Sequence, residues 1–309
     1  VGTASSGCAG DFVTTLRDVG IKLVEGRRLN KSDAEVIANT EDLISVAALA
    51  DDLRRRRHGN KTTFVRVQEI SIRDILVGDI EILSSAGEVR IADTIADYDE
   101  ALRAVKALVA VAGSVPVTGF ALDALVEQSG GHTRKLLDML TGLKETGLSL
   151  VAEARPEQLL TPESLEIMGE AGLKVGRLTV GDAVDHGGVD LLTRVADWGT
   201  AVEHVHAIAP LSRVLKPQPT TGYRDLRQVA LARLLVDNID VVQVDWNLYG
   251  PKLAQVSLMF GANDIDTVSP LGSDDLGRRR APLEEITQNI HASALIPVQR
   301  NGRFEILET

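Results

Sequence analysis

From residue 62 onward the chain alternates short apolar segments with amphipathic stretches, and this pattern constrains the fold more than any other feature. The apolar segments predict strands over 63–68, 88–93, 115–120, 148–153, 173–180, 204–209, 241–246 and 264–268. Helical spacing between them predicts helices over 98–112, 133–146, 162–171, 189–198 and 223–237. Eight strands with helices between them are typical of a closed parallel barrel. We therefore predict an α/β protein with a (β/α)8 TIM-type barrel over 61–309 and an N-terminal helical extension over 1–60.

The extension has helical rather than strand-like spacing. Ser32-Asp33-Ala34-Glu35 has the form of a capping box, and Thr40 is a second candidate for a helix start. Four arginines at 54–57 precede Gly59, and both cations and glycine suit the C-terminal end of a helix. The arginines could form a phosphate- or carboxylate-binding patch, but a solvated helix end is the reading we favour.

Composition excludes several classes of protein. The 33 basic and 44 acidic residues give a net charge of −11, which argues against a nucleic-acid or anionic-membrane binder. No run of eighteen apolar residues predicts a membrane span, and the first residues lack the pattern of a secretory signal. The one cysteine, Cys8, cannot form an internal disulfide or supply three thiolates to a cluster. We expect a cytoplasmic protein.

Alternation along each expected strand predicts which side chains point into the barrel. In the fourth strand, for example, Leu150, Ala152 and Ala154 are assigned to the outer face, which leaves Glu153 and Arg155 inside. The full inward set is Arg66, Gln68, Glu153, Arg155, Arg177, Thr179, Gln243, Asp245 and Asn247. Charged side chains inside a barrel are costly unless they pair or meet a ligand. Two readings follow, an internal salt-bridge network with water or a site for an anionic ligand bound by arginines.

A metal site is a further reading of the sixth strand. His204 and His206 share one face of that strand, and Asp182 and His186 lie near the end of the preceding strand. Zinc or iron needs three converging ligands, and no third ligand is fixed by spacing. Because a His-x-His pair alone is weak evidence, we assign no metal ligand. The alternative is one interior and one surface histidine.

The C-terminal third carries a family resemblance. The residues that carry it are Pro219-Thr220-Thr221-Gly222-Tyr223-Arg224-Asp225-Leu226-Arg227, Arg233-Leu234, Asp237-Asn238-Ile239, Trp246, Gly250-Pro251-Lys252-Leu253-Ala254-Gln255 and Phe260-Gly261-Ala262-Asn263-Asp264. This order resembles the radical S-adenosylmethionine enzymes of the futalosine route to menaquinone. Aminofutalosine synthase is most similar, followed by dehypoxanthine futalosine cyclase and the FO synthases. The likeness is strong over 217–266 and weaker over 85–210.

The resemblance breaks where the family binds its cofactors. The family's C-x3-C-x2-C motif, which holds a [4Fe–4S] cluster, falls on Leu76, Ile80 and Leu83, and these apolar residues could fill the emptied volume by packing. Ala92-Asp93-Thr94 stands where the family has a Gly-Gly-rich turn for the methionine end of the cofactor. The family's Glu-Glu-containing turn reads Ser269-Pro270-Leu271-Gly272-Ser273-Asp274-Asp275. We expect no cluster and no radical chemistry, and S-adenosylmethionine binding is in doubt.

Our first functional hypothesis is a cluster-less barrel of menaquinone biosynthesis that binds and transforms a small anionic, carboxylate-bearing metabolite. If the chain is an enzyme, it is a non-radical lyase or transferase. The acid/base candidates are Glu153, Asp245 and His206, and the substrate-binding candidates are Arg66, Gln68, Arg155, Arg177, Thr179 and Asn247.

Two alternatives stay open. The chain could be a non-catalytic partner or regulatory subunit of an active radical SAM paralogue, and a large exposed apolar patch would indicate this. The assembly would then be a homodimer or a heterodimer with such a paralogue. It could also be a metal-dependent lyase or hydrolase that uses His204, His206 and Asp182 or His186.

Overall fold

A computed structural model of the chain describes residues 15–78, 80–159, 162–180, 188–213, 221–272 and 282–308. Cys8, Asp182 and His186 lie outside these residues, as do Pro219 and Thr220 of the family resemblance. No helix in the described part of the chain is long and apolar enough to cross a membrane.

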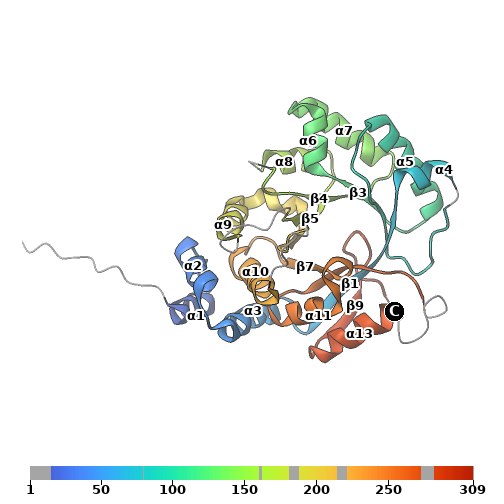
Figure 1. The fold of residues 1–309 in the computed structure, drawn as a ribbon. Coiled ribbons are helices and arrows are strands. Elements are labelled where there is room, and N and C mark those ends of the chain that lie inside the picture. The colour runs from blue at the N-terminus through green and yellow to red at the C-terminus, as the bar shows by residue number, and fades with distance from the viewer. Residues whose placement is uncertain are drawn as a thin grey trace, which may run out of the picture.

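Eight parallel strands close into a barrel that helices surround (Figure 1). The strands, with a ninth described below, are β1 Lys61–Ile70, β2 Glu88–Ile91, β3 Val117–Ala121, β4 Leu150–Ala154, β5 Val175–Thr179, β6 Val205–Ala209, β7 Val241–Asp245, β8 Asp264–Val268 and β9 Ile296–Gln299. Each strand from β1 to β8 pairs with the next, and β8 pairs with β1. The predicted (β/α)8 barrel is confirmed, and the eight predicted strands match the observed bounds to within two residues.

The ninth strand, β9, was not predicted. The backbone carbonyl of Asn60, just before β1, accepts from the N–H of Ile296, and that of Phe64 in β1 accepts from the N–H of Arg300. The carbonyl of Arg66, on the same edge of β1, accepts from Gly87, just before β2. β9 therefore occupies the first half of this edge and β2 the second half. Because β9 has only four residues and includes Pro297, it carries little strand signal.

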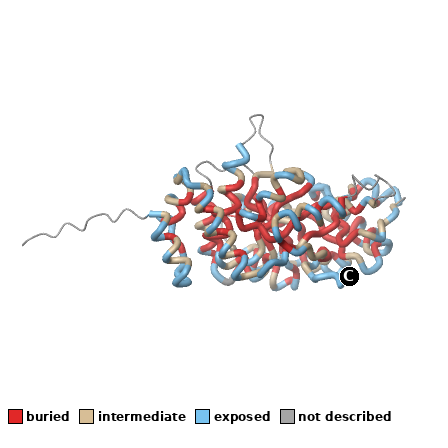
Figure 2. The backbone as a smooth tube through the Cα atoms, turned by 90° about the horizontal axis from the view of Figure 1, so that it is seen from below, coloured by how far each residue is buried: buried red, intermediate tan, exposed pale blue. Residues whose placement is uncertain are grey.

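The helices cover the outside of the barrel. They are α1 Leu16–Val24, α2 Lys31–Asn39, α3 Leu43–His58, α4 Ile72–Val77, α5 Tyr98–Ala112, α6 Leu122–Ser129, α7 Thr133–Glu145, α8 Glu163–Glu170, α9 Val189–Asp197, α10 Gly222–Leu235, α11 Trp246–Met259 and α13 Pro282–Ala292, with a 3₁₀ helix, η2, at Gly199–His204. Apolar side chains between these helices and the strands form the core, and buried residues fill the centre of the molecule in Figure 2.

The N-terminal helices form an extension that lies beside α9 and α10 (Figure 1). α2 begins at Lys31, because Asn30 and Asp33 form a capping box. The side chain of Asn30 accepts from the backbone N–H of Asp33, and the Asp33 carboxylate accepts from the backbone N–H of Asn30. The capping box expected at Ser32 is therefore wrong by two residues. Thr40 ends α2, and Asp42 caps α3. The division into two domains stays a prediction.

The arginines at the end of α3 are paired. Gly59 is the C-cap of α3, as expected, with φ 60°. Arg54 is fully buried, and its Nη2 lies 2.8 Å from Asp51 Oδ1. The next three arginines pair with Asp51, Asp52 and Asp240. Acidic partners surround this helix end, which agrees with a structural role for its charges.

Candidate functional site

The C-terminal segment closes the barrel at the N-terminal ends of the strands. Arg300, which follows β9, donates from Nε and Nη2 to both carboxylate oxygens of Asp264 in β8, at 2.7 Å each. The guanidinium carbon of Arg300 lies 3.8 Å from the centre of the Phe304 ring. Phe304 in turn stacks on His206 of β6, with ring centroids 4.5 Å apart. We call this C-terminal segment, with Arg300 and Phe304, the plug. The cavity above the plug has a volume of about 10 Å³, which is space for about one water molecule.

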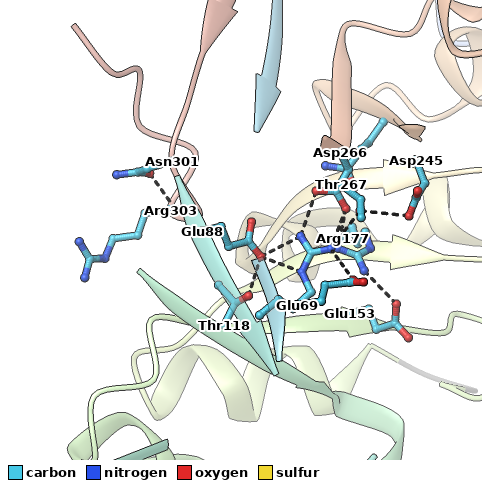
Figure 3. A network of polar contacts seen from close by, with 12 residues as sticks. Glu69, Glu88, Thr118, Glu153, Arg177, Asp245, Asp266, Thr267, Asn301 and Arg303 are labelled. Carbon is cyan, nitrogen blue, oxygen red and sulfur yellow. Dashed lines mark hydrogen bonds and ion pairs between the residues drawn. The ribbon is translucent and has the colours of Figure 1, made fainter. Parts of the chain in front are cut away.

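A layer of buried ion pairs crosses the barrel above the plug (Figure 3). Arg90 of β2 donates to both oxygens of Asp266 in β8, from Nη1 at 3.0 Å and from Nη2 at 2.9 Å. Nε of Arg90 also donates to Glu88 at 2.8 Å, and Thr118 donates to the same Glu88 oxygen at 2.6 Å. Arg177 of β5 donates from Nη1 to Asp266 at 2.9 Å. Side chains of four strands are thereby joined in one network.

Burial and charge set the protonation of this layer. Burial by itself would raise the pKa of Asp266, but attraction from Arg90 and Arg177 outweighs it and holds this pKa far below its usual range. Burial also lowers the pKa of Arg177, and repulsion from Arg90 adds to that effect. The pKa of Arg90 is raised, because attraction from Asp266 and Glu88 outweighs its burial. Asp266 therefore keeps its negative charge between the two guanidiniums.

The network continues to the C-terminal ends of the strands, which form the rim of the barrel. Glu153 of β4 accepts on Oε2 from Arg177 Nη2 at 3.3 Å, and the same oxygen lies 3.6 Å from Arg213 Nε. Arg213 also donates from Nη1 to Asp245 Oδ2 at 3.0 Å. We call Glu153, Arg177, Thr179, Arg213 and Asp245 the rim site. Glu153 and Arg213 keep 25% and 30% of their side chains exposed, so solvent reaches both.

Asp245 has a structural part in this site. It ends β7 and caps α11, since its Oδ1 accepts from the N–H of Leu248 at 2.8 Å. Its Oδ2 accepts from Thr267 at 3.1 Å as well as from Arg213. Both oxygens are thus engaged, and Asp245 positions the groups around it.

Four of the predicted site residues lie at the rim. Glu153, Arg177 and Asp245 are joined there by ion pairs with one another or with Arg213, and Thr179 is the last residue of β5. Asn247 is exposed in the first turn of α11, two residues beyond Asp245. The orientation expected for β4 is wrong in part, because Leu150 and Ala152 line the cavity inside the barrel. Glu153 nevertheless meets Arg177, its register partner in β5.

The expected orientation of β1 is also wrong. Glu69 pairs in register with Arg90 and lies 3.9 Å from it, so Glu69 is on the interior face. Arg66 and Gln68 alternate with Glu69 and lie on the other face. Arg66 donates from Nη2 to the carbonyl oxygens of Pro270 at 2.6 Å and Leu271 at 3.2 Å. Gln68 bonds to the backbone of Glu81 and Leu83, so neither residue belongs to the rim site.

Arg155 is likewise separate from the interior. It follows the last residue of β4, and its Nε donates to Asp123 Oδ2 of α6 at 2.9 Å. Its backbone N–H donates to the other oxygen of Asp123 at 3.2 Å. The three arginines expected to bind one carboxylate together, Arg66, Arg155 and Arg177, are therefore not brought together.

The two histidines of the sixth strand also separate. His206 faces the plug at the opposite end of the barrel from the rim, so the expected acid/base role has no place for it there. His204 ends η2 and packs on α8, where its ring occupies the space that a side chain at Gly169 would need. In the described part of the chain no three His, Cys, Asp or Glu side chains converge as metal ligands.

Sequence reasoning missed Arg213, Arg90, Asp266, Glu88 and Glu69. For Asp266 there was a signal, since Asp264 and Asp266 alternate with Ile265 in β8. Arg90 and Glu88 alternate with Val89 and Ile91 in the same way. Arg213 lies beyond the end of β6, where no alternation operates.

The residues aligned with the family's cluster cysteines lie after β1. Leu76 is in α4 and is 40% exposed. Ile80 is partly buried against the core, and Leu83 is partly buried. The expectation that all three fill a vacated volume is therefore wrong for Leu76.

The closed ring of eight parallel strands and the helices around it define the fold class, a (β/α)8 barrel. Among solved structures, methylornithine synthase superposes with a TM-score of 0.62 at 14% identity, covering 90% of this chain and 97% of that one. The FeFe-hydrogenase maturase HydG of Carboxydothermus hydrogenoformans gives a TM-score of 0.63 at 13% identity, covering 92% and 79%. At these identities the likeness concerns the fold alone.

Sequence comparisons then identify the family. Residues 192–309 match the model of the CofH/MqnC C-terminal region. Aminodeoxyfutalosine synthase of Thermus thermophilus is 31% identical over 79% of this chain and 82% of its own length. A 5-amino-6-(D-ribitylamino)uracil–L-tyrosine 4-hydroxyphenyl transferase of Methanococcus maripaludis is 25% identical over 90% of this chain and 96% of its own. The chain belongs to the futalosine-pathway radical SAM family.

Proposed function

We propose that this chain is a member of the family that works without an iron–sulfur cluster and binds a carboxylate-bearing metabolite of the menaquinone route at the rim site. The family membership supports the pathway, because relatives include aminodeoxyfutalosine synthase and cyclic dehypoxanthine futalosine synthase. The cluster and the ligand are argued from this chain's own residues.

The donor set does not fit a [4Fe–4S] cluster. Such clusters are held by Cys thiolates, and this chain has one cysteine in all. The segment after β1 offers Leu76, Ile80 and Leu83 at the positions aligned with the family's ligands, and an aliphatic side chain has no lone pair for iron. We therefore derive no step through a cluster.

One observation carries the ligand proposal. Arg177 Nε and Thr179 Oγ1, two residues apart on one face of β5, are buried and have no hydrogen-bond partner among the residues that the structure describes. Buried polar atoms in proteins nearly always have a partner, so an unpartnered pair calls for a group that supplies one. Both atoms are hydrogen-bond donors, and the acceptor they lack can be a carboxylate oxygen of a ligand.

Arg213 adds a charged donor beside this pair. It shares Glu153 Oε2 with Arg177, so the two guanidiniums lie next to each other. The pKa of Arg213 is raised, because attraction from Glu153 and Asp245 outweighs its burial, and it stays charged at neutral pH. With 30% of its side chain exposed, it can bind an anion that approaches from solvent.

Glu153 is the group placed to move a proton. Its Oε2 faces the two arginines, whereas the other carboxylate oxygen has no partner in the described part of the chain. A carboxylate held from one side and open on the other can accept a proton from a ligand anchored by Arg213 and return it. Asp245 holds Arg213 during this transfer, and His206 takes no part.

The test is a titration followed by tryptophan fluorescence, since Trp246 directly follows Asp245. Benzoate is the probe for a carboxylate, and benzamide is its neutral control. We expect benzoate alone to change the fluorescence and Arg213→Ala to raise its Kd about tenfold or more, as loss of a charge-assisted hydrogen bond does. Arg134→Ala, an exposed site on α7, is the matched control. Equal response to benzoate and benzamide would overturn the proposal.

A second candidate function, a non-catalytic partner of a radical SAM paralogue, has one observation in its favour. Leu76 and Val77 of α4 are 40% and 74% exposed at the C-terminal end of β1. Sedimentation of the chain mixed with an aminodeoxyfutalosine synthase tests it. A complex that Val77→Asp abolishes would support it, and two independent species would count against it.

A further inference from the structure

The first turn of α11 is set apart from the rest of that helix. Asp245 caps it, and Gly250 has φ 77° and ψ 164°, which is not helical and suits glycine. Pro251 follows directly and starts the remaining helix. Residues 246–249 therefore form a single turn fixed at the end of β7, beside the rim site.

Tyr249 connects this turn to the segment that carries Arg213. Its hydroxyl donates to the backbone carbonyl of Ser212, the residue before Arg213. Burial raises the pKa of Tyr249, and the nearby Asp225 adds to this, so the hydroxyl keeps its proton and remains a donor. The other backbone anchor is the N–H of Arg213, which donates to the carbonyl of Val180 at 3.0 Å.

Arg213 is thus held at both ends from the first turn of α11 and its cap. Tyr249 fixes the backbone before it, while Asp245 fixes its guanidinium through Nη1 at 3.0 Å. Arg213 lies beyond the end of β6, so its backbone depends on single contacts such as these two and not on a strand ladder. A long, flexible side chain binds an anion weakly unless its geometry is set in advance.

We infer that Tyr249 is a positioning residue of the rim site, which sets Arg213 for anion binding through the carbonyl of Ser212. This inference rests on the proposed function. It predicts that the hydroxyl of Tyr249 matters to a ligand only through Arg213.

A double-mutant cycle tests the inference with benzoate as the probe. Tyr249→Phe removes only the hydroxyl, and we expect the benzoate Kd to rise about fivefold, the size of one hydrogen bond. In an Arg213→Ala background the same change should alter the Kd less than about twofold, because its target is gone. Tyr98→Phe is the matched control, since the Tyr98 hydroxyl donates to the Met139 carbonyl at 2.7 Å between α5 and α7, away from the rim.

A second readout needs no ligand. The Nε–H signal of Arg213 in an NMR spectrum, assigned from its loss in Arg213→Ala, should move toward the position of free arginine in Tyr249→Phe and stay unchanged in Tyr98→Phe. If the chain binds no benzoate but this signal moves, the proposed function fails and the positioning role stands. If benzoate binds with an unchanged Kd in Tyr249→Phe and the signal stays in place, the inference is overturned while the proposed function stands.

Discussion

Arg90 and Asp266 form a two-point ion pair inside the barrel, with Nη1 of Arg90 3.0 Å from Oδ2 and Nη2 2.9 Å from Oδ1 of Asp266. The pair joins β2 to β8, the two strands that lie on either side of β1. Asp266 also accepts from Arg177, so one carboxylate balances two buried guanidiniums. Removing it leaves both cations without their main counter-charge.

Asp266→Asn should therefore destabilise the protein severely. We expect a loss of about 3–5 kcal/mol in the free energy of unfolding, the usual cost of removing one partner of a buried ion pair. Urea unfolding followed by circular dichroism measures it. Asp138→Asn on α7, whose partner Arg134 is exposed, should cost less than about 1 kcal/mol. A loss below about 1 kcal/mol in Asp266→Asn would contradict this account, because the two guanidiniums would then be stabilised without the charge of Asp266.

The plug at the other end of the barrel should behave as a coupled pair. Arg300→Met leaves the buried Asp264 carboxylate with the neutral donors Gln243 and Thr63 but without its cation, and we expect a loss of about 3–5 kcal/mol. Asp264→Leu combined with Arg300→Met should cost less than the sum of the single changes, because no lone charge remains. Additive losses in the urea midpoints of the three variants would contradict this account.

The half-buried His206 of the plug should make stability depend on pH between about 4 and 6.5. Burial lowers the pKa of His206 to about 4, and Lys174 and Arg300 repel its charged form further. In that window the unfolded chain binds a proton that the folded chain does not, so stability falls as pH falls and is unaffected above about 6.5.

His206→Phe isolates this contribution, because the ring can still stack on Phe304 while it no longer titrates. Between pH 7 and pH 4.5 we expect the variant to lose about 1 kcal/mol less than the natural chain; partial solvent exposure of His206 limits the effect. Urea unfolding at both pH values measures the difference. Parallel pH profiles would show that His206 already charges in the folded state.

Iron–sulfur reconstitution tests the cluster argument directly. After anaerobic incubation with iron and sulfide, followed by desalting, we expect less than about a tenth of a cluster per chain, since at least three thiolates are needed to hold one. Cys8→Ser should leave this result unchanged, because one thiolate cannot hold a cluster alone. Stoichiometric iron with absorbance near that of a known cluster protein run in parallel would refute the argument.

The fold could be predicted from the sequence because its periodicity is strong. β8 and α5 were predicted with the bounds that the structure has, 264–268 and 98–112. The plug could not be predicted, because Arg300 and Phe304 act through contacts with β8 and β6, far away in sequence. Nothing local in the chain marks β9 as a partner of β1.

The site was predicted only where alternation gave the correct interior face. It did so for β5 and β7, which supply Arg177 and Asp245. It failed for β1, since Val65 and Val67 are apolar and face the same side as Glu69, whereas the polar Arg66 bonds to backbone carbonyls elsewhere. A polar side chain satisfied by the backbone cannot be told from a ligand-binding one by its spacing alone.

Variants of Thr179 and Arg155 distinguish the rim site from the site predicted by sequence, because Thr179 belongs to the rim site and Arg155 only to the predicted one. Thr179→Val keeps the shape of the side chain but removes a buried hydroxyl that has no partner in the described part of the chain. Replacing an unsatisfied polar group should raise the free energy of unfolding by up to about 1 kcal/mol, while the benzoate Kd rises about threefold to fivefold.

Arg155→Ala should leave the Kd unchanged and cost at most about 1 kcal/mol, because its pair with Asp123 is 43% exposed on the arginine side. Fluorescence titration and urea unfolding of the same preparations measure both quantities. Weaker binding in Arg155→Ala together with unchanged binding in Thr179→Val would place the carboxylate at the end of β4 instead of inside the rim on β5.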